Sequence, residues 1–268
     1  MCAAEFSLTV LGTRGSMAVS GRDYSEFGMA TSCYLVKAGN ESIFLDAGSG
    51  LANAPLEISG TPVILLSHLH VDHIMGLGRY KRLSQRGTDT QICIPEKYEG
   101  GTSRAIDSLF SPPLWPVKLT DYKGNVRFEP LRFPMRIGEV TLEGMEGNHP
   151  GGCLVMRLSY RGKSIVYATD YEYEERSFAA LTDFSKDADL LLFDGQYTIE
   201  ESKEKKGYGH STAEQGLVLM EQSGVKNMLI IHHAPDCEDS VLKEREARIN
   251  NKNVRYAREG DVIRLSDH

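Results

Sequence analysis

The sequence predicts a single α/β domain built as an αββα sandwich, in which two β-sheets pack face to face and helices cover their outer faces. Three observations favour this fold. Short, β-branched apolar runs that end at Gly, Asp or Pro recur along the first two thirds of the chain and are typical of strands. Helical patterns alternate clearly with strands only in the last third. No linker or repeat divides the 268 residues, so one domain over residues 1–268 is expected.

Nine strands are expected ahead of the helical part of the chain. Each corresponds to an apolar run that is too short for a helix and is bounded by turn residues. The expected strands cover residues 6–11, 33–36, 42–46, 62–67, 91–94, 126–129, 140–145, 153–160 and 164–169.

A helix is expected over residues 211–222, because Ala213, Leu217 and Met220 recur on one side at helical spacing. Ser211, with Glu214 three residues later, matches a capping box and predicts that the helix starts there. A strand over 228–231, a helix over 239–249 and a last strand over 261–265 complete the prediction.

Composition disfavours two classes of partner. The formal net charge of −7 opposes binding to long polyanions. Basic clusters at 79–86, 203–206 and 252–258 are expected to be solvated surface, with phosphate contact as the alternative. No apolar run approaches the ~20 residues of a membrane helix, so no membrane association is expected. The first residues lack the basic start of a signal peptide and are expected to enter the first strand.

The cysteines predict a reducing environment. They are scattered, odd in number and contain no CxxC pair, which disfavours a disulfide framework or a zinc ribbon. Free thiols of this kind suit the cytoplasm. The five are Cys2, Cys33, Cys93, Cys153 and Cys237.

The segment His-Leu-His-Val-Asp-His at residues 68–73 carries the clearest chemical signal. It directly follows the apolar run 63–66, so four potential ligands leave the end of one expected strand. The turn after a strand can aim several of these side chains at one point, and three imidazoles with a carboxylate suit Zn, Mn or Fe. A chance cluster of exposed histidines is the weaker interpretation.

This motif, placed after an apolar strand, resembles the signature of the metallo-β-lactamase superfamily, and the likeness runs from Leu11 to about Asp239. The resemblance implies further ligands at the ends of later strands. His149 lies in a turn rich in Gly and Pro, Asp170 ends the run 165–169, and His232 ends the run 229–231. His233 is the alternative to His232; otherwise it supports the site or faces outward.

The resemblance implies two divalent metal ions, with Zn expected first and Mn next. One ion would be held by His68, His70, His149 and Asp170, and the other by Asp72, His73, Asp170 and His232. Asp170 and a water would bridge the ions, which lower the pKa of that water toward ~7 and make hydroxide available as the nucleophile. Asp46, in an early Asp-x-Gly turn, would orient a ligand histidine.

His210 resembles a histidine of the phosphodiesterase branch of the superfamily, which includes the ribonuclease Z-like enzymes that process tRNA 3′ ends. It precedes an expected helix, whose free N–H groups attract an anion. His210 is therefore expected to act as a general acid toward the leaving alkoxide; the alternative is an exposed residue before a helix cap. Together with Asp72, it forms the expected catalytic pair.

The expected activity is hydrolysis of a small phosphodiester, a cyclic nucleotide first of all. The tRNA-processing members carry a long arm between the positions of His149 and Asp170, whereas about 20 residues here leave room only for a hairpin. A large structured RNA is thus a less favoured partner. The alternatives are a tRNA 3′-end endoribonuclease without the arm and a non-catalytic metal-containing binding or sensor protein. A lactam- or thioester-opening hydrolase would leave His210 without a role. The resemblance also suggests a homodimer.

Two further residues keep two interpretations each. Arg14, in the turn after the first expected strand, is either a phosphate partner or a structural ion-pair residue. Trp115, the one tryptophan, lies in the Pro-rich segment 111–116. That segment is either a rigid loop over the core or an aromatic platform that stacks on a base beside the metal site.

Overall fold

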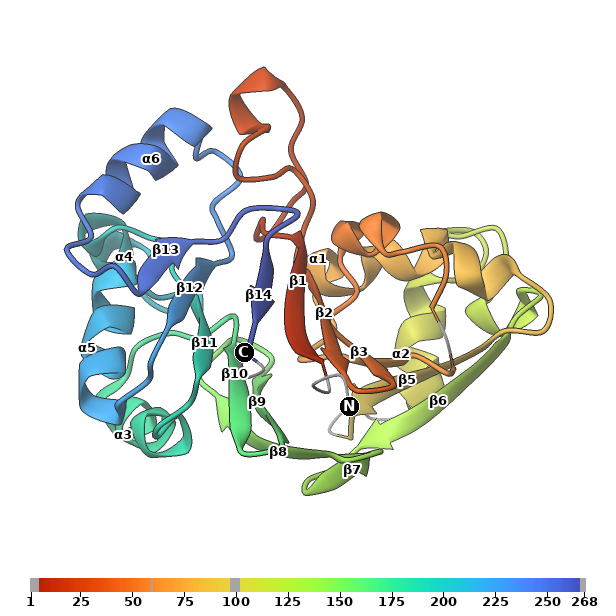
Figure 1. Cartoon of the computed structure of the whole chain (residues 1–268). Coiled ribbons are helices and arrows are strands. Elements are labelled where there is room, and N and C mark those ends of the chain that lie inside the picture. Colours follow the sequence, from red (N-terminus) through yellow and green to blue (C-terminus); the bar gives the residue numbers. More distant parts are fainter. Residues whose placement is uncertain (1–4, 59, 97–101, 266–268) are drawn as a thin grey trace.

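Two seven-stranded sheets lie against each other in the computed structural model, with helices on their outer faces (Figure 1). The structure describes residues 5–58, 60–96 and 102–265, so Cys2 lies outside the described residues. The predicted αββα sandwich is confirmed. Among the described residues, no helix combines the length and the apolar character needed to span a membrane.

The first sheet is built mainly from the N-terminal half of the chain. Its strands, in spatial order, are β14 (Val262–Arg264), β1 (Phe6–Gly12), β2 (Cys33–Ala38), β3 (Glu41–Leu45), β4 (Val63–Leu65), β5 (Asp89–Pro95) and β6 (Asn125–Leu131). Pairing is antiparallel from β14 to β3 and parallel from β3 to β6.

The second sheet is built from the C-terminal half. Its strands, in spatial order, are β13 (Val254–Tyr256), β12 (Met228–Ile231), β11 (Leu190–Asp194), β10 (Lys163–Ala168), β9 (Cys153–Tyr160), β8 (Val140–Gly147) and β7 (Met135–Ile137). Strands β10 to β13 are parallel, and β7 to β10 are antiparallel. Parallel strands place all their carboxyl ends at one edge, so loops from both sheets meet there.

The helices differ in how they cover the two sheets. In Figure 1, α3 to α6 lie outside the second sheet, whereas α1 and α2 lie beside the first. The α-helices are α1 (Val71–Ile74), α2 (Thr102–Leu109), α3 (Glu175–Phe184), α4 (Ile199–Glu204), α5 (Ala213–Ser223) and α6 (Asp239–Ala247). Short 3₁₀ helices are η1 (Arg22–Tyr24), η2 (Ser49–Asn53), η3 (Met75–Arg79), η4 (Lys81–Ser84) and η5 (Leu119–Asp121).

Three hydrophobic clusters hold the layers together. The central one lies between the sheets and includes Leu8, Leu45, Tyr167 and Leu192, all fully buried. The second lies under α3, α5 and α6, and the third lies beneath the loops and helices beside the first sheet. Each fully buried Leu, Ile or Phe contributes about 1.5–3 kcal/mol relative to exposure. These clusters make the strand ends a rigid platform.

The expected strands are all present, and each of their ends lies within two residues of the predicted position. The hairpin predicted between His149 and Asp170 is confirmed as β9 and β10, joined through residues 161–162. Strands β7, β11 and β13 and helices α1, α2, α3 and α4 were not predicted. Strand β11 is a continuous apolar run buried on both faces, which has no alternation to distinguish it from a buried helix. Strands β7 and β13 have only three residues each.

The predicted capping box at Ser211 is wrong by one residue. Helix α5 starts at Ala213 and is capped by Thr212, whose hydroxyl accepts the N–H of Gln215 at 3.2 Å. The Gln215 side chain accepts the N–H of Thr212 at 3.0 Å in return. The Ser211 hydroxyl is buried and donates instead to the carbonyl of Tyr171, so it does not cap the helix.

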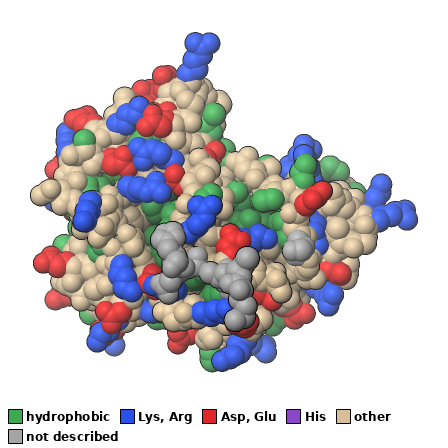
Figure 2. Space-filling model, in the orientation of Figure 1, with side chains coloured by type: hydrophobic (Ala, Val, Ile, Leu, Met, Phe, Trp, Pro, Cys, Tyr) green, Lys and Arg blue, Asp and Glu red, His purple; other side chains and the backbone are tan. Residues whose placement is uncertain are grey.

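Charges of both signs share the surface. On the face shown in Figure 2, Lys and Arg side chains lie among Asp and Glu side chains and no histidine is visible. In the basic cluster 252–258, Arg258 forms a 2.7 Å ion pair with Glu246, and Arg255 pairs with Asp261. This agrees with a solvated, ion-paired surface at that cluster.

We expect Thr212→Ala to lower the free energy of unfolding by ~1 kcal/mol, because it removes the acceptor for an N–H group at the start of α5. Glu214→Gln, at the position that the sequence pattern favours, should lower this free energy by only ~0.3 kcal/mol, through the weaker interaction with the helix dipole. Urea unfolding of both variants measures the difference. A larger loss for Glu214→Gln would contradict the observed cap.

Candidate metal centre

All seven predicted metal ligands converge at the edge where the carboxyl ends of the parallel strands meet. The loop after β4 supplies His68 and His70, and helix α1 supplies Asp72 and His73. The turn after β8 supplies His149, and Asp170 and His232 follow β10 and β12. Their ligand atoms form two groups, each with all atoms within 4.8 Å of one another. One group is His68, His70, His149 and Asp170; the other is Asp72, His73 and His232. The family resemblance implies the same two sets, with Asp170 also in the second.

Asp170 lies between the two groups and turns one oxygen to each. Its Oδ1 is 3.1 Å from His73 Nε2 and 3.2 Å from His232 Nε2. Its Oδ2 is 3.6 Å from His149 Nε2 and 3.7 Å from His68 Nε2. A carboxylate in this position is able to bridge two cations.

The remaining contacts close each group. In the first, His149 Nε2 lies 3.1 Å from His70 Nδ1. In the second, Asp72 Oδ2 lies 3.2 Å from His73 Nε2 and 3.3 Å from His232 Nε2. The backbone N–H of Ser16 donates to the same Asp72 oxygen at 2.7 Å, which fixes the carboxylate.

Acceptors behind three of the imidazoles fix their orientation. His73 Nδ1 is 2.7 Å from Asp46 Oδ2, and this is the predicted orienting contact. His232 Nδ1 is 3.0 Å from Gln196 Oε1, and His149 Nδ1 is 2.9 Å from the carbonyl of Gly209. Each acceptor holds the proton on Nδ1 and leaves the Nε2 lone pair facing the cluster.

The residues present fit divalent cations. His68 Nε2 is buried, faces Asp170 and has no hydrogen-bond partner, while its Nδ1 lies 3.0 Å from the Ser67 hydroxyl. This nitrogen faces the other ligand atoms of its group and is available to bind a cation. Imidazole and carboxylate ligands in this number suit zinc and other divalent transition metals.

Contacts within the cluster strongly shift the pKa values of its histidines and carboxylates. Burial disfavours charge on the His232 ring, but the carboxylates of Asp170 and Asp72 outweigh it and raise the pKa of His232 to about 8. Burial also opposes the charge of Asp170, yet the rings of His232, His73 and His68 hold the pKa of this carboxyl well below its usual range. A bound cation therefore replaces protons that otherwise sit between these groups.

His210 borders the cluster, and its ring is oriented by a residue that the sequence patterns did not single out. Its Nδ1 lies 2.7 Å from Oδ2 of Asp194, which is fully buried at the end of β11. The His210 ring stacks on that of His232, with centroids 4.9 Å apart, and one of its nitrogens lies within 4.8 Å of the ligand atoms of Asp170 and His232. Like Asp46 and Asp170, Asp194 ends an apolar run, and this position is the one feature of the sequence that could have indicated its role.

His233 and Arg14 belong to the supporting structure. His233 is buried, its Nε2 donates to the carbonyl of Ala257 at 2.8 Å, and burial lowers its pKa to about 3. Arg14 is fully buried and donates to the carbonyls of Gly28 and Cys237, both at 2.7 Å. These contacts favour the structural interpretation of Arg14 over the phosphate-partner one.

Trp115 packs as part of a covering loop. Its ring meets Phe110 edge to face, its Nε1 donates to the Tyr122 hydroxyl at 3.0 Å, and a Cβ at Gly78 would overlap it. The rigid-loop interpretation is thereby favoured over base stacking.

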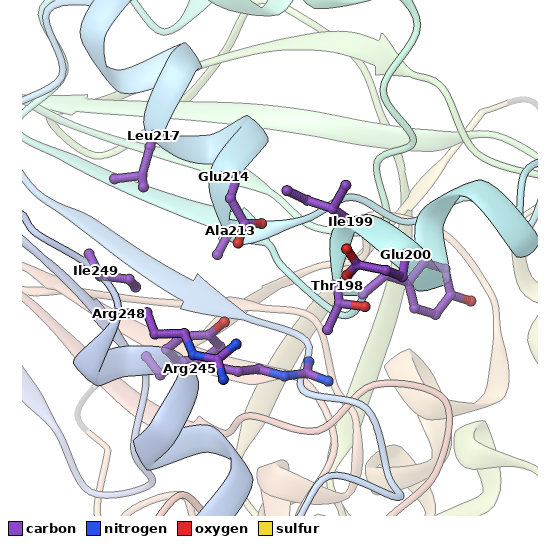
Figure 3. Close-up of a pocket in the computed structure, with 11 residues that line it drawn as sticks. Thr198, Ile199, Glu200, Ala213, Glu214, Leu217, Arg245, Arg248 and Ile249 are labelled. Atoms are coloured by element: carbon purple, nitrogen blue, oxygen red, sulfur yellow. The ribbon is translucent and has the colours of Figure 1, made fainter.

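A hollow that does not include the metal ligands lies between α4, α5 and α6, and Tyr197 is one of the residues that line it (Figure 3). Arg245 and Arg248 line one part of it, and Glu200 and Glu214 line another. Because Tyr197 also meets the His210 ring edge to face, this residue separates the hollow from the metal centre.

Comparison with known proteins decides the family. A model described as the β-lactamase superfamily domain matches residues 41–233. The chain belongs to the β-lactamase superfamily. Within this superfamily it is 26% identical over 265 residues to the probable metallo-hydrolase YhfI of Bacillus subtilis, covering 95% of this chain and 98% of that protein. It is also 23% identical over 257 residues to a ribonuclease Z of Metallosphaera sedula, covering 80% and 86%.

Solved structures agree with the fold. The crystal structure of YhfI has a TM-score of 0.75 at 22% identity and covers 97% of this chain and 99% of its own. A diphosphatase from the PhnP family has a TM-score of 0.72 at 18% identity, covering 96% and 97%. The predicted resemblance, including the ribonuclease Z-like relationship, is confirmed. Family and side-chain cluster together support a metallo-hydrolase.

Gly209 touches a ligand ring and gives a test of the centre, with the nearby Gly207 as its control. A Cβ at Gly209 would overlap the His149 ring, whereas Gly207 has nothing within 4 Å. Their φ angles are +92° and +89°, so substitution by Ala strains both backbones alike. We expect Gly209→Ala to weaken zinc binding at least tenfold and Gly207→Ala to leave it near wild type, measured by chelator competition. Equal losses would contradict the ring contact.

The choice between the adjacent histidines is also testable. His232→Gln removes a ring nitrogen from the cluster and should weaken zinc binding by more than roughly tenfold. His233→Gln keeps a donor for the Ala257 carbonyl, so we expect only ~1–2 kcal/mol of lost folding free energy and unchanged zinc affinity. Zinc titration and urea unfolding of both variants measure this; a reversed pattern would assign the ligand to His233.

Proposed function

We propose that the protein is a binuclear metal-dependent phosphodiesterase that hydrolyses a small phosphodiester, with a cyclic nucleotide as the first substrate to test. The observation that carries the proposal is the His210–Asp194 pair beside the metal cluster. We further propose that the two side-chain groups hold one divalent cation each, zinc before manganese. The homodimer and the cytoplasmic location stay predictions.

The residues of the centre have different roles, which follow from where they lie. Asp170 presents an oxygen to each group and sets the spacing between them, while Asp46, Gln196 and Gly209 hold three of the imidazoles in place. When bound, divalent cations in such a site supply Lewis-acid activation of a water and stabilise charge on phosphoryl oxygens. The burial of Asp170 and Asp72 excludes competing water from the carboxylates.

His210 supplies the function that a phosphodiester substrate requires. The leaving group of such a substrate is an alkoxide, which needs a proton as the bond to phosphorus breaks. Asp194 accepts from Nδ1 and fixes the ring, and one nitrogen of His210 lies within 4.8 Å of the ligand atoms of Asp170 and His232; we infer that Nε2 delivers this proton. Asp194 in turn accepts the N–H groups of Tyr171 and Gln196, at 3.2 and 3.0 Å, which fix its carboxylate.

Two features favour a small substrate. The hairpin of β9 and β10 turns through residues 161–162 and carries no arm at that place. The net charge of −7 also disfavours a long polyanion.

A second candidate is a tRNA 3′-end endoribonuclease, favoured by the ribonuclease Z relatives. Cleavage of a precursor tRNA, with cyclic nucleotides left intact, would select it. Binding of a cyclic nucleotide without any turnover would instead support a non-catalytic sensor.

We expect His210→Ala to slow hydrolysis of a cyclic nucleotide by ~10²–10⁴, because its alkoxide leaving group depends on the proton. Bis-p-nitrophenyl phosphate should be affected far less, since p-nitrophenolate leaves without protonation. Asp194→Asn should act in the same direction. Steady-state kinetics with both substrates, at equal metal content, measure the contrast.

Equal slowing of the two substrates would contradict the general-acid role. If the metal-loaded wild type cleaves neither of the two substrates, the phosphodiesterase proposal itself is contradicted.

A further inference from the structure

Glu172 joins three loops of the metal centre without being one of its ligands. Its carboxylate accepts the N–H of Gly207, at 2.7 Å to Oε1 and 3.0 Å to Oε2, and the N–H of Gly209 at 2.8 Å to Oε2. Glu172 itself follows the bridging Asp170 by two residues. The side chain thus ties the segment after β10 to a turn far along the chain.

The backbone of Glu172 makes a second tie, to the turn that carries His149. The N–H of Glu172 donates to the carbonyl of Asn148 at 2.8 Å. The Asn148 side chain donates to the carbonyl of Glu172 at 3.1 Å. Asn148 immediately precedes His149, so this pairing fixes the start of the ligand turn relative to Asp170.

The turn held by Glu172 serves two histidines at once. Its carbonyl at Gly209 accepts from Nδ1 of His149 at 2.9 Å, and His210 follows directly. A shift of this turn therefore rotates the His149 ring and displaces His210 together. Residues that act through such outer contacts tune ligand orientation and cation affinity.

The turn has few other anchors. Gly207 and Gly209 have φ angles of +89° and +92° and no side chains to pack. Tyr208 between them is 65% exposed, and its N–H makes a 3.2 Å bond within the same loop, to the carbonyl of Lys205. The two N–H groups bound to one carboxylate therefore hold the turn strongly, beside the 2.9 Å contact of the Gly209 carbonyl with His149.

We propose that Glu172 is a positioning residue whose carboxylate holds the Gly207–Gly209 turn and thereby sets the orientation of His149 and the place of His210. The part that concerns His210 rests on the proposed function, whereas the part that concerns His149 does not. Glu172 touches neither substrate nor cation in this role.

The first test is the zinc affinity of Glu172→Ala, Glu172→Asp and Glu172→Gln, measured by chelator competition on the folded full-length chain. Ala removes the acceptor and Asp draws it back by one methylene, so we expect about tenfold weaker binding in both. Gln keeps one oxygen able to accept both N–H groups but loses the negative charge and places an NH2 group beside the Gly207 N–H, so it should bind zinc less tightly than wild type and more tightly than the Ala variant. If Glu172→Ala does not fold, the Asp and Gln pair decides the result.

Glu175→Ala serves as the control, because this exposed glutamate lies three residues on, at the start of α3. It should leave zinc affinity unchanged. Wild-type affinity in both the Ala and Asp variants, or a Gln variant as weak as Ala, would overturn the proposal.

The second test asks whether Glu172 also positions His210, which is the part that rests on the proposed function. In Glu172→Ala saturated with zinc, kcat for a cyclic nucleotide should fall at least threefold further than kcat for bis-p-nitrophenyl phosphate, since His210 is displaced. Equal falls would overturn the His210 part. If wild type cleaves neither substrate, the proposed function fails, but the zinc affinities still decide whether Glu172 positions His149.

Discussion

The carboxylate of Asp170 sits almost without solvent between rings from three other loops, and the geometry of the centre follows from this position. Each of its oxygens faces two imidazole nitrogens, at 3.1–3.7 Å. A buried carboxylate is costly unless positive charge compensates it. The rings themselves supply that charge as protons, or cations supply it in their place. The buried Asp170 carboxylate is therefore stable only with positive charge beside it.

The fold places the groups that supply this charge beside Asp170 by bringing several strand ends together. Strands β4, β10, β11 and β12 each end at this edge, and each contributes a residue of the centre or its support. The central core between the sheets fixes the strands, and outer acceptors such as Asp46 and Gln196 fix the rings. The precision of the site thus comes from rigid strands plus a second layer of hydrogen bonds.

The sequence predicts the ligands better than their supports. The spacing of residues 68–73 after an apolar run is a local signal, and the family resemblance leads from it to His149, Asp170 and His232. Asp194 has only the weak signal of ending an apolar run, and Gln196 has none, because their roles arise from contacts with His210 and His232, 16 and 36 residues away. The carboxylate of Glu172 likewise contacts a turn about 35 residues on, which no periodicity encodes.

Local rules also failed where tertiary contacts compete with them. Ser211 fits a capping box as well as Thr212 does, but its hydroxyl is taken by the Tyr171 carbonyl. Strand β11 was missed because burial on both faces removes its alternation. In both cases the surrounding structure, rather than the segment, decides the outcome.

The most direct test of the central claim is anomalous diffraction at the zinc edge from crystals of the zinc-loaded protein. The account predicts two zinc peaks about 3.5–4 Å apart, with Asp170 touching both. A single peak, or two peaks of which Asp170 touches only one, would contradict it.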